Sequence, residues 1–305
     1  MSSIEQILTV SPAAANWRPP RPEGRRLLGS SDWVWALAFV VPYILVLLAF
    51  VLVPLGYGLW MGSSPALYAA LWSDPIYART LVNTLIFVGL AVNVKMILAL
   101  LLSGFFMRRR RWIKGLLVIF MLPWVISAIP AFISFHWMLV SEQGFINSFL
   151  RQVVGVEGPL WLANPRLALG ANIVAYVWKW LPFWTLVLLA ARMAIPPDIY
   201  EAAQVDGAGG LRRFADITLP LIANVFFIAT LLSVIWTVGD FTIVFLVSGG
   251  GPFHLTEVVA TLANRYWFDY AQPDLGVAAV ISMLPLLIPI AVVLMRRVQA
   301  RGVQL

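Results

Sequence analysis

Two charged side chains stand inside otherwise apolar stretches of this sequence, where a charge is costly. Lys179 lies in AYVWKWLPFW and Asp240 lies in IWTVGDFTIVF. An ion-coupled secondary transporter would use such a pair as a proton or sodium relay, and a simpler role is an ion pair that tethers two helices. A third role is contact with a polyhydroxyl solute, because sugar rings stack on aromatic side chains while their hydroxyls need polar partners.

The neighbours of both charges are aromatic or can form hydrogen bonds, as a sugar pathway requires. We therefore predict a substrate pathway lined by Asn172, Tyr176, Trp178, Lys179, Trp236, Thr237 and Asp240. Lys95 and His136 are further polar groups in apolar stretches. The alternatives to a place in the pathway are snorkelling or local pairing for Lys95 and an interfacial hydrogen bond for His136. The tether and the solute contact both stay open at this point.

Several kinds of catalytic site are excluded. There is no Cys and there are only two His, so the chain has no thiolate metal site and no zinc site of standard spacing. No nucleophile stands with a base, and no G-x-x-x-x-G-K-[ST] motif is present to hold ATP phosphates. The GAGG run at residues 207–210 precedes no Lys and is typical of a turn. We expect no enzyme activity, metal or cofactor in this chain.

The composition indicates an integral membrane protein. Of the 305 residues, 61% are hydrophobic and 11% are charged, against about 25% charged in an ordinary soluble domain. The formal net charge of +7 does not indicate nucleic acid binding, because the basic residues flank apolar segments rather than line one face.

About 20 apolar residues are needed for a helix to cross the hydrocarbon layer. Six stretches meet or approach this length, so we predict an all-α protein with six transmembrane helices. They are residues 33–55, 80–106, 113–140, 167–191, 221–247 and 276–295. Prolines inside or beside them predict kinks near Pro42, Pro130, Pro182 and Pro285.

The distribution of Lys and Arg predicts the orientation, because loops rich in them stay cytoplasmic. One side carries clusters at residues 18–26, 108–114, 192–213 and 296–301, whereas the other carries only Arg79, Arg151, Arg166 and Arg265. Both termini are therefore expected in the cytoplasm. Residues 1–30 are predicted to be a cytoplasmic tail and residues 31–305 the membrane domain. The first apolar run exceeds the 7–15 residues of a signal peptide, so we expect a retained helix.

With this orientation, residues 196–220 form a cytoplasmic elbow between the fourth and fifth spans. Pro196 and Pro197 suit the start of a short helix, Asp198 and Glu201 suit its positive end, and Asp206 with Gly207 provides a stop. A second helical turn is expected through LRRFADITLP. The physics alone leaves a simple connector and a docking site for another protein both open.

The elbow resembles the signature loop of the membrane subunits of binding-protein-dependent ABC importers, called the EAA loop. The matching positions are Glu201, Ala202, Ala203, Gly207, Ile217, Leu219 and Pro220. The resemblance implies that the first short helix docks into a cytoplasmic ATPase subunit, with Glu201 in polar contact and Asp206 and Gly207 at the turn.

The segments WKWLPF and GGGPF resemble the carbohydrate-uptake group of these importers, which moves sugars, polyols or glycerol phosphates. The resemblance implies a permease in the bacterial or archaeal inner membrane. It also implies a second permease of a different sequence, two ATPase subunits that bind ATP and magnesium, an external solute-binding protein and surrounding lipid as partners.

Overall fold

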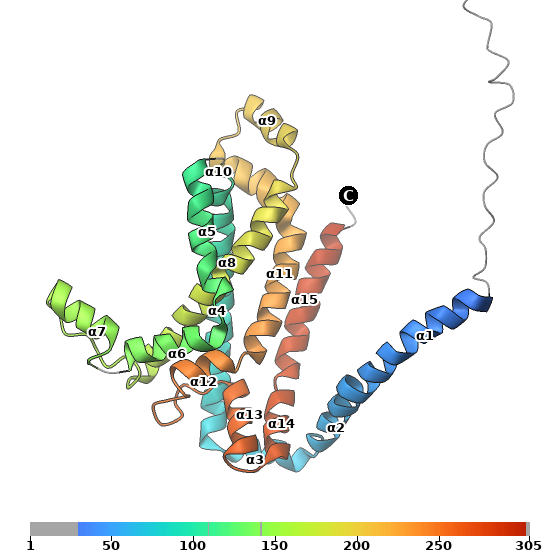
Figure 1. The fold of residues 1–305 in the computed structure, drawn as a ribbon, viewed down its shortest axis with the longest axis vertical. Helices are drawn as coiled ribbons and strands as arrows, with labels where there is room; N and C mark the ends of the chain where they lie inside the picture. Colours follow the sequence, from blue (N-terminus) through green and yellow to red (C-terminus); the bar gives the residue numbers. More distant parts are fainter. Residues whose placement is uncertain (1–29, 109, 141, 303–305) are drawn as a thin grey trace, which may run out of the picture. The chain divides into compact units, whose positions relative to one another are not determined.

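The computed structural model describes residues 30–108, 110–140 and 142–302, and the predicted tail at residues 1–30 lies almost wholly outside them. Every regular element in the described part is helical, which confirms the all-α prediction (Figure 1). The chain divides into two compact units, Met1–Gly58 and Leu59–Leu305.

The first unit contains the first predicted span. Helix α1 covers Ser30–Leu47 with Pro42 inside it, a π-helical turn covers Leu48–Leu52, and α2 covers Val53–Met61. Together they make an apolar run, Trp33–Met61, that is long enough to cross a membrane.

Two long helices form the centre of the second unit. Helix α4 covers Pro75–Phe106 and helix α8 covers Pro165–Met193. Each begins with an Asx cap and a proline, because the side chains of Asp74 and Asn164 accept hydrogen bonds from the first free backbone N–H groups. Phe87 of α4 and Tyr176 of α8 lie in one buried cluster. Helix α8 continues through Pro182, where a kink was expected, and it stays one helix.

Two predicted spans are broken. The third consists of α5, Arg111–Val125, and α6, Ala128–Leu139, which meet at 90°. The fifth ends as α11, Leu219–Gly239, and a separate short helix α12, Thr242–Val247, follows after Asp240. The sequence predicted a kink near Pro130, and the 90° break lies just before this proline. It predicted no break at Asp240, because apolar periodicity does not report where a backbone ladder stops.

The last span and several short helices complete the second unit. The last span consists of α14, Pro273–Ile281, and α15, Leu284–Gly302. Figure 1 shows α3, Pro65–Ser73, and α13, Val259–Phe268, at the opposite end of the second unit from α9, Pro197–Val205. Helix α7, Phe145–Phe149, and the turn Leu150–Val154 precede α8. Counting the bent pair as one, six helices in the described part of the chain are long and apolar enough to span a membrane.

Candidate functional site

The predicted elbow is present as a short helix followed by a tight turn. Helix α9 ends at Val205, after which the N–H of Gly207 donates to the carbonyl of Gln204 and the N–H of Ala208 to that of Ala203. Gly207 has φ of 74°, a value that residues with a side chain rarely adopt. The helix and its glycine stop are therefore as the sequence predicted.

The outer face of α9 is uncovered. Glu201, Ala202 and Asp206 are exposed, while Ala203 is half-buried. Val205 and Leu211, on either side of the turn, are 89% and 86% exposed. Figure 1 shows α9 standing beyond the ends of α5, α8 and α11. Apolar side chains on a projecting helix form a surface that suits a protein partner.

The elbow is tied to the spans through its second half, where α10, Gly210–Arg213, and the π-helical turn Phe214–Thr218 lead into α11. A hydrogen bond of 3.0 Å joins the Tyr200 hydroxyl of α9 to the Thr218 hydroxyl. The motif positions Ile217, Leu219 and Pro220 lie at this junction. Helix α9 is thereby joined to the start of α11.

Arg192 makes a second connection between the elbow and the spans. The sequence did not predict it, because a basic residue at the end of a span indicates only the orientation in the membrane. The side chain of Arg192 is buried at the end of α8, and Nη2 donates to the carbonyl of Leu100 in α4 at 2.7 Å. The guanidinium lies 5.3 Å from the centre of the Phe214 ring in the elbow. A Cβ at Gly104 would come within 2.7 Å of Nη1, so this glycine leaves room for the guanidinium beside α4. Arg192 therefore links α8, α4 and the elbow.

A cavity of about 490 Å³ lies farther along the bundle, at the two helix breaks. Tyr176 and Trp180 of α8 and Trp236 of α11 supply aromatic rings, α6 supplies Phe132, and Asp240 supplies a carboxylate. The ring centres of Trp180 and Trp236 are 6.3 Å apart. The Nε1–H of Trp180 is itself buried and has no acceptor among the described residues. The cavity therefore offers aromatic ring faces and one carboxylate acceptor to a solute.

Asp240 is positioned by the break that it occupies. Its Oδ1 accepts from the N–H of Thr242 at 2.9 Å, which caps α12, while the residue lines the cavity. Behind the cavity, the Tyr176 hydroxyl donates to the Thr237 hydroxyl at 3.0 Å, and Thr237 donates in turn to the carbonyl of Ser233. Lys95 of α4 places its Nζ 4.5 Å from the centre of the Tyr176 ring and interacts electrostatically with Asp240.

Lys179 does something that the sequence did not predict. Its Nζ donates to the carbonyls of Pro123 at 2.8 Å, Trp124 at 3.1 Å and Ile126. These carbonyls are left without helical partners where α5 stops, and a cation at the negative end of a helix is favourable. Lys179 forms no ion pair with Asp240, so the structure does not contain the tether that the sequence left open: the unpaired carbonyls of the break hold the ammonium instead.

The other predicted pathway residues divide as follows. Tyr176, Trp236 and Asp240 line the cavity, and Thr237 supports Tyr176. Asn172 lies away from the cavity lining and donates to the Ser248 hydroxyl at 2.9 Å. Trp178 packs edge-on against Phe135, with ring centres 5.1 Å apart.

A comparison with known protein families decides what such a chain is. Residues 14–303 match the family described as "Binding-protein-dependent transport system inner membrane component". The chain belongs to this family. Like other members, this inner membrane component is a non-catalytic permease subunit, and a partner ATPase hydrolyses ATP.

Individual relatives are also permease proteins of transport systems. This chain is 36% identical to the trehalose/maltose transport system permease protein MalF of Thermococcus litoralis. The match extends over 201 residues, which are 66% of this chain and 67% of the relative. The chain is 32% identical over 238 residues, 77% of this chain and 76% of the relative, to the sulfoquinovosyl glycerol transport system permease protein SmoG of Agrobacterium fabrum. A crystal structure of a bacterial alginate ABC transporter, solved in complex with an alginate pentasaccharide-bound periplasmic protein, contains a chain of the same fold. The TM-score is 0.78 at 24% identity, over 87% of this chain and 93% of the other.

The alternative of an ion-coupled secondary transporter is not supported. It required Lys179 and Asp240 to act together, whereas Lys179 is bound to the break after α5 and the chain belongs to an ATP-driven transport family.

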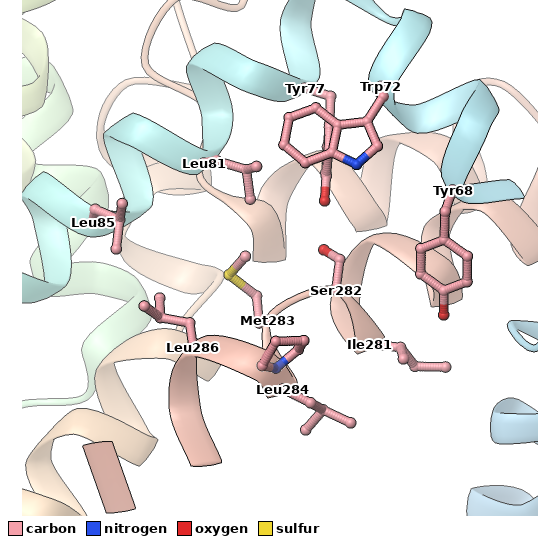
Figure 2. A pocket seen from close by; sticks show the side chains of 11 residues that line it. Tyr68, Trp72, Tyr77, Leu81, Leu85, Ile281, Ser282, Met283, Leu284 and Leu286 are labelled. Carbon is pink, nitrogen blue, oxygen red and sulfur yellow. The ribbon is translucent and has the colours of Figure 1, made fainter. Parts of the chain in front are cut away.

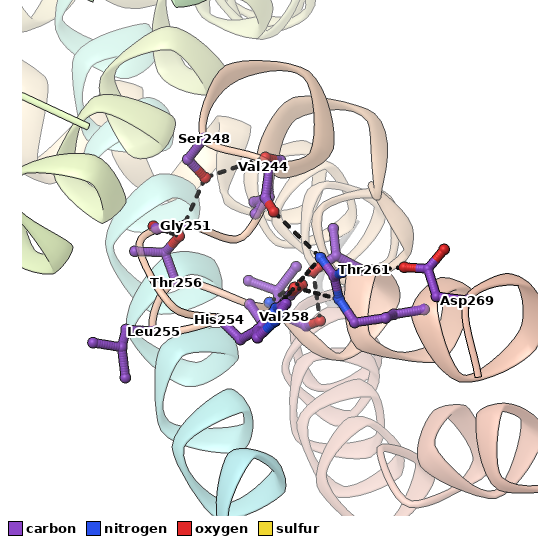
Figure 3. Close-up of polar contacts among 12 residues, drawn as sticks. Val244, Ser248, Gly251, His254, Leu255, Thr256, Val258, Thr261 and Asp269 are labelled. Atoms are coloured by element: carbon purple, nitrogen blue, oxygen red, sulfur yellow. Dashed lines mark hydrogen bonds and ion pairs between the residues drawn. The ribbon is translucent and has the colours of Figure 1, made fainter. Parts of the chain in front are cut away.

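At the end of the permease opposite the elbow, the GGGPF segment forms a loop held by a polar network (Figure 3). Glu257 is fully buried, and its Oε1 accepts from Nε and Nη2 of Arg265 at 2.9 and 2.7 Å. Arg265 also donates to Asp269 at 3.1 Å. The Asn83 amide of α4 donates to the carbonyls of Leu255 and Glu257. The loop is thus tied to both α4 and α13.

A further polar contact fixes the start of α4 to α13. The Tyr266 hydroxyl donates to the carboxylate of Asp74, and burial raises the pKa of this phenol. The hydroxyl therefore stays protonated and remains a donor over the physiological pH range.

A second cavity of about 700 Å³ lies nearby, between α3, the first turns of α4 and the break before α15 (Figure 2). Tyr68, Trp72 and Tyr77 line one wall, and residues 281–286 line the other. The Tyr68 hydroxyl donates to the carbonyl of Gly62. Its lining is mostly apolar and it lacks the carboxylate of the cavity at Asp240, so it suits a solute less well.

Proposed function

We propose that this permease forms half of the translocation pathway of an ATP-driven importer for a carbohydrate-type solute: a sugar, a polyol or a glycerol phosphate. The observation that carries the proposal is the cavity at the two helix breaks. The rings of Tyr176, Trp180 and Trp236 and the carboxylate of Asp240 line this cavity of about 490 Å³. Aromatic faces with a few placed polar groups match the alternating apolar and hydroxyl faces of a sugar ring.

Similar proteins support this solute class. The two permease relatives above are named for trehalose or maltose and for sulfoquinovosyl glycerol. These are polyhydroxyl compounds, as the cavity chemistry requires, and we extend that class to the present chain.

Coupling to the ATPase is assigned to the elbow, residues 196–220. Glu201, Ala202, Ala203, Asp206 and Gly207 would form the docking surface, and Ile217, Leu219 and Pro220 would carry its movement into α11. Two contacts support this route: the Tyr200–Thr218 hydrogen bond, and Arg192 between Phe214 and the carbonyl of Leu100. An ATP-driven change requires such differential contacts in two states of the transporter.

The remaining partners follow from this assignment. We propose a second permease of different sequence, two ATPase subunits that bind ATP and magnesium, and a solute-binding protein outside the membrane. Both termini of the permease would be cytoplasmic, with residues 1–30 as a tail and 31–305 as the membrane domain. The elbow would then face the ATPase subunits.

Purification of the tagged transporter from its native membrane tests the proposal. We expect mass spectrometry to find a P-loop ATPase and a second permease, and proteoliposomes containing the complex and its binding protein to take up a sugar, polyol or glycerol phosphate only with ATP. Uptake of amino acids but not of polyhydroxyl solutes would overturn the solute class. ATP-independent uptake by the chain alone would overturn the coupling.

The role of Glu201 has its own test. We expect Glu201→Lys to leave membrane insertion unchanged and to reduce the uptake per ATP hydrolysed, because it reverses the charge at the docking surface. Asp198→Lys, at another exposed position of α9, is the matched control and should reduce this ratio less. Equal ratios in wild type and Glu201→Lys would remove Glu201 from its role.

A further inference from the structure

A third cavity lies apart from both the elbow and the pathway. It has a volume of about 390 Å³ and is bounded by α6, the start of α7, Trp161 and the first turns of α8. Figure 1 shows α6, α7 and the beginning of α8 close together. The volume is within the range of about 300–1,000 Å³ that small-molecule sites occupy. We call this cavity the α8 groove.

The α8 groove is apolar except at one end. Phe135, Met138 and Leu139 of α6 form one wall, and Ile146 of α7 closes part of it. The polar atom of Trp161 is already used, because its Nε1–H donates to Oδ1 of Asn147 at 2.8 Å. A sugar would find almost no hydrogen-bond partners here, so the groove does not suit the transported solute.

The groove follows α8 from the membrane surface inward. Arg166 is the second residue of the span Pro165–Met193, and Leu167, Gly170, Ala171 and Val174 line the groove below it. Eight residues of helix separate Arg166 from Val174, which is about 12 Å along the axis. One leaflet contributes about 15 Å of hydrocarbon, so the groove has nearly the depth of a leaflet.

Arg166 is the charged residue of this lining, and it stands at the level of the headgroups. Its side chain is exposed, and none of the ion pairs in the described part of the chain includes it. The adjacent Asn164 caps the backbone of α8 through its side-chain oxygen. The guanidinium is therefore available to a phosphate, which it can bind through two parallel hydrogen bonds.

We propose that the α8 groove binds one phospholipid with an anionic headgroup. Arg166 holds the lipid phosphate, and an acyl chain lies in the groove along Gly170, Ala171 and Val174. The apolar wall, the depth of one leaflet and the single cation at headgroup level each match a part of this molecule. A second permease covering the groove would need a carboxylate facing Arg166, and it is the competing outcome of the test.

Native mass spectrometry of the delipidated transporter complex tests the proposal, with dioleoyl-phosphatidylglycerol and dioleoyl-phosphatidylcholine as the two probes. We expect at least one phosphatidylglycerol to bind more tightly than phosphatidylcholine. Arg166→Gln should weaken phosphatidylglycerol binding at this site about tenfold, the ratio that one charge-assisted hydrogen bond contributes. Arg166→Lys keeps the charge and should retain most of the preference.

A substitution that fills the groove separates the acyl chain from the headgroup. A Cβ at Gly170 meets nothing within 4 Å, so Gly170→Leu should fold normally and occupy the space of the acyl chain. We expect it to weaken binding of both lipids at this site. Gly115→Leu, at an exposed glycine of α5 that also has open space, is the matched control and should bind both lipids as the wild type does.

Two results would overturn the proposal. One is equal binding of the two lipids that neither Arg166→Gln nor Gly170→Leu changes. The other is loss of the second permease from the complex in both variants with lipid binding unchanged, which would make the groove a protein interface.

Discussion

Glu257 and Arg265 illustrate how single charged residues are accommodated in this permease. Glu257 is fully buried and depends on two hydrogen bonds from Arg265 and on the nearby His254 ring nitrogen, 3.3 Å away. A buried ion pair adds little net stability, but removing one partner leaves a desolvated charge. The pair therefore matters more for holding the loop before α13 in one conformation than for total stability.

The first prediction concerns this pair. Arg265→Met should destabilise the permease by about 3–5 kcal/mol, because Glu257 would be left buried without its cation. The measurement is the thermal unfolding midpoint of the purified complex. Asp269→Asn is the matched control, since Asp269 contacts the same arginine but is 55% exposed, and its removal should cost at most about 1 kcal/mol. Similar shifts in the two variants would contradict the assignment.

At the scale of elements, the two helix breaks shape the cavity. The break between α5 and α6 orients Ala128 and Phe132 toward it, and the break between α11 and α12 places Asp240 at its edge. Backbone groups released at a break inside the membrane must find partners, because lipid supplies none. Lys179 supplies them at the first break, and the carboxylate of Asp240 does so at the second.

The second prediction is that Lys179 positions α6 rather than touching solute. Lys179→Met should lower stability by about 3 kcal/mol, since several hydrogen bonds to a charged group are lost, and should reduce maximal uptake as the wall of the cavity moves. Lys114→Met, at an exposed lysine of α5, is the control and should do neither. A variant of normal stability whose only defect is a higher KM would instead indicate direct solute contact.

The third prediction concerns the end of α9. Gly207→Ala should strain the turn by about 1–2 kcal/mol, because an alanine at positive φ is unfavourable, and should weaken association with the ATPase while insertion stays normal. Gly209→Ala is the matched control: Gly209 has φ of −66° and open space around it. Co-purification of the ATPase with each variant is the measurement, and equal yields would show that the turn does not depend on glycine.

The elements differ in how far the sequence predicted them. Span positions followed from apolar length, and α9 with its stop at Gly207 followed from prolines, acidic residues and glycine, since all of these are local signals. The break at Asp240 and the partners of the backbone groups released at the breaks did not follow. Lys179 lies more than fifty residues from the carbonyls that it binds, and only the packing of α8 on α5 brings them together. Proline was a partial guide: breaks lie beside Pro130 and Pro285, whereas α11 stops at Asp240 without a proline.

At the scale of the whole molecule, Lys95 and Asp240 join the central helices to the cavity. Lys95 is buried in α4 beside the ring of Tyr176 in α8, and Asp240 lies at the break after α11. Their charges interact through the centre of the bundle.

The fourth prediction is a double-mutant cycle on this pair. Lys95→Met alone leaves Asp240 without its cation, and Asp240→Asn alone leaves Lys95 buried without its anion, so each should lower the thermal unfolding midpoint of the complex. The double variant removes both charges and should be more stable than the sum of the single effects implies, by about 1–3 kcal/mol of coupling. Additive effects would show that the two charges do not interact. Because Asp240 also lines the cavity, uptake should stay impaired in the double variant even where stability recovers, which separates the structural role of the pair from the contact of Asp240 with solute.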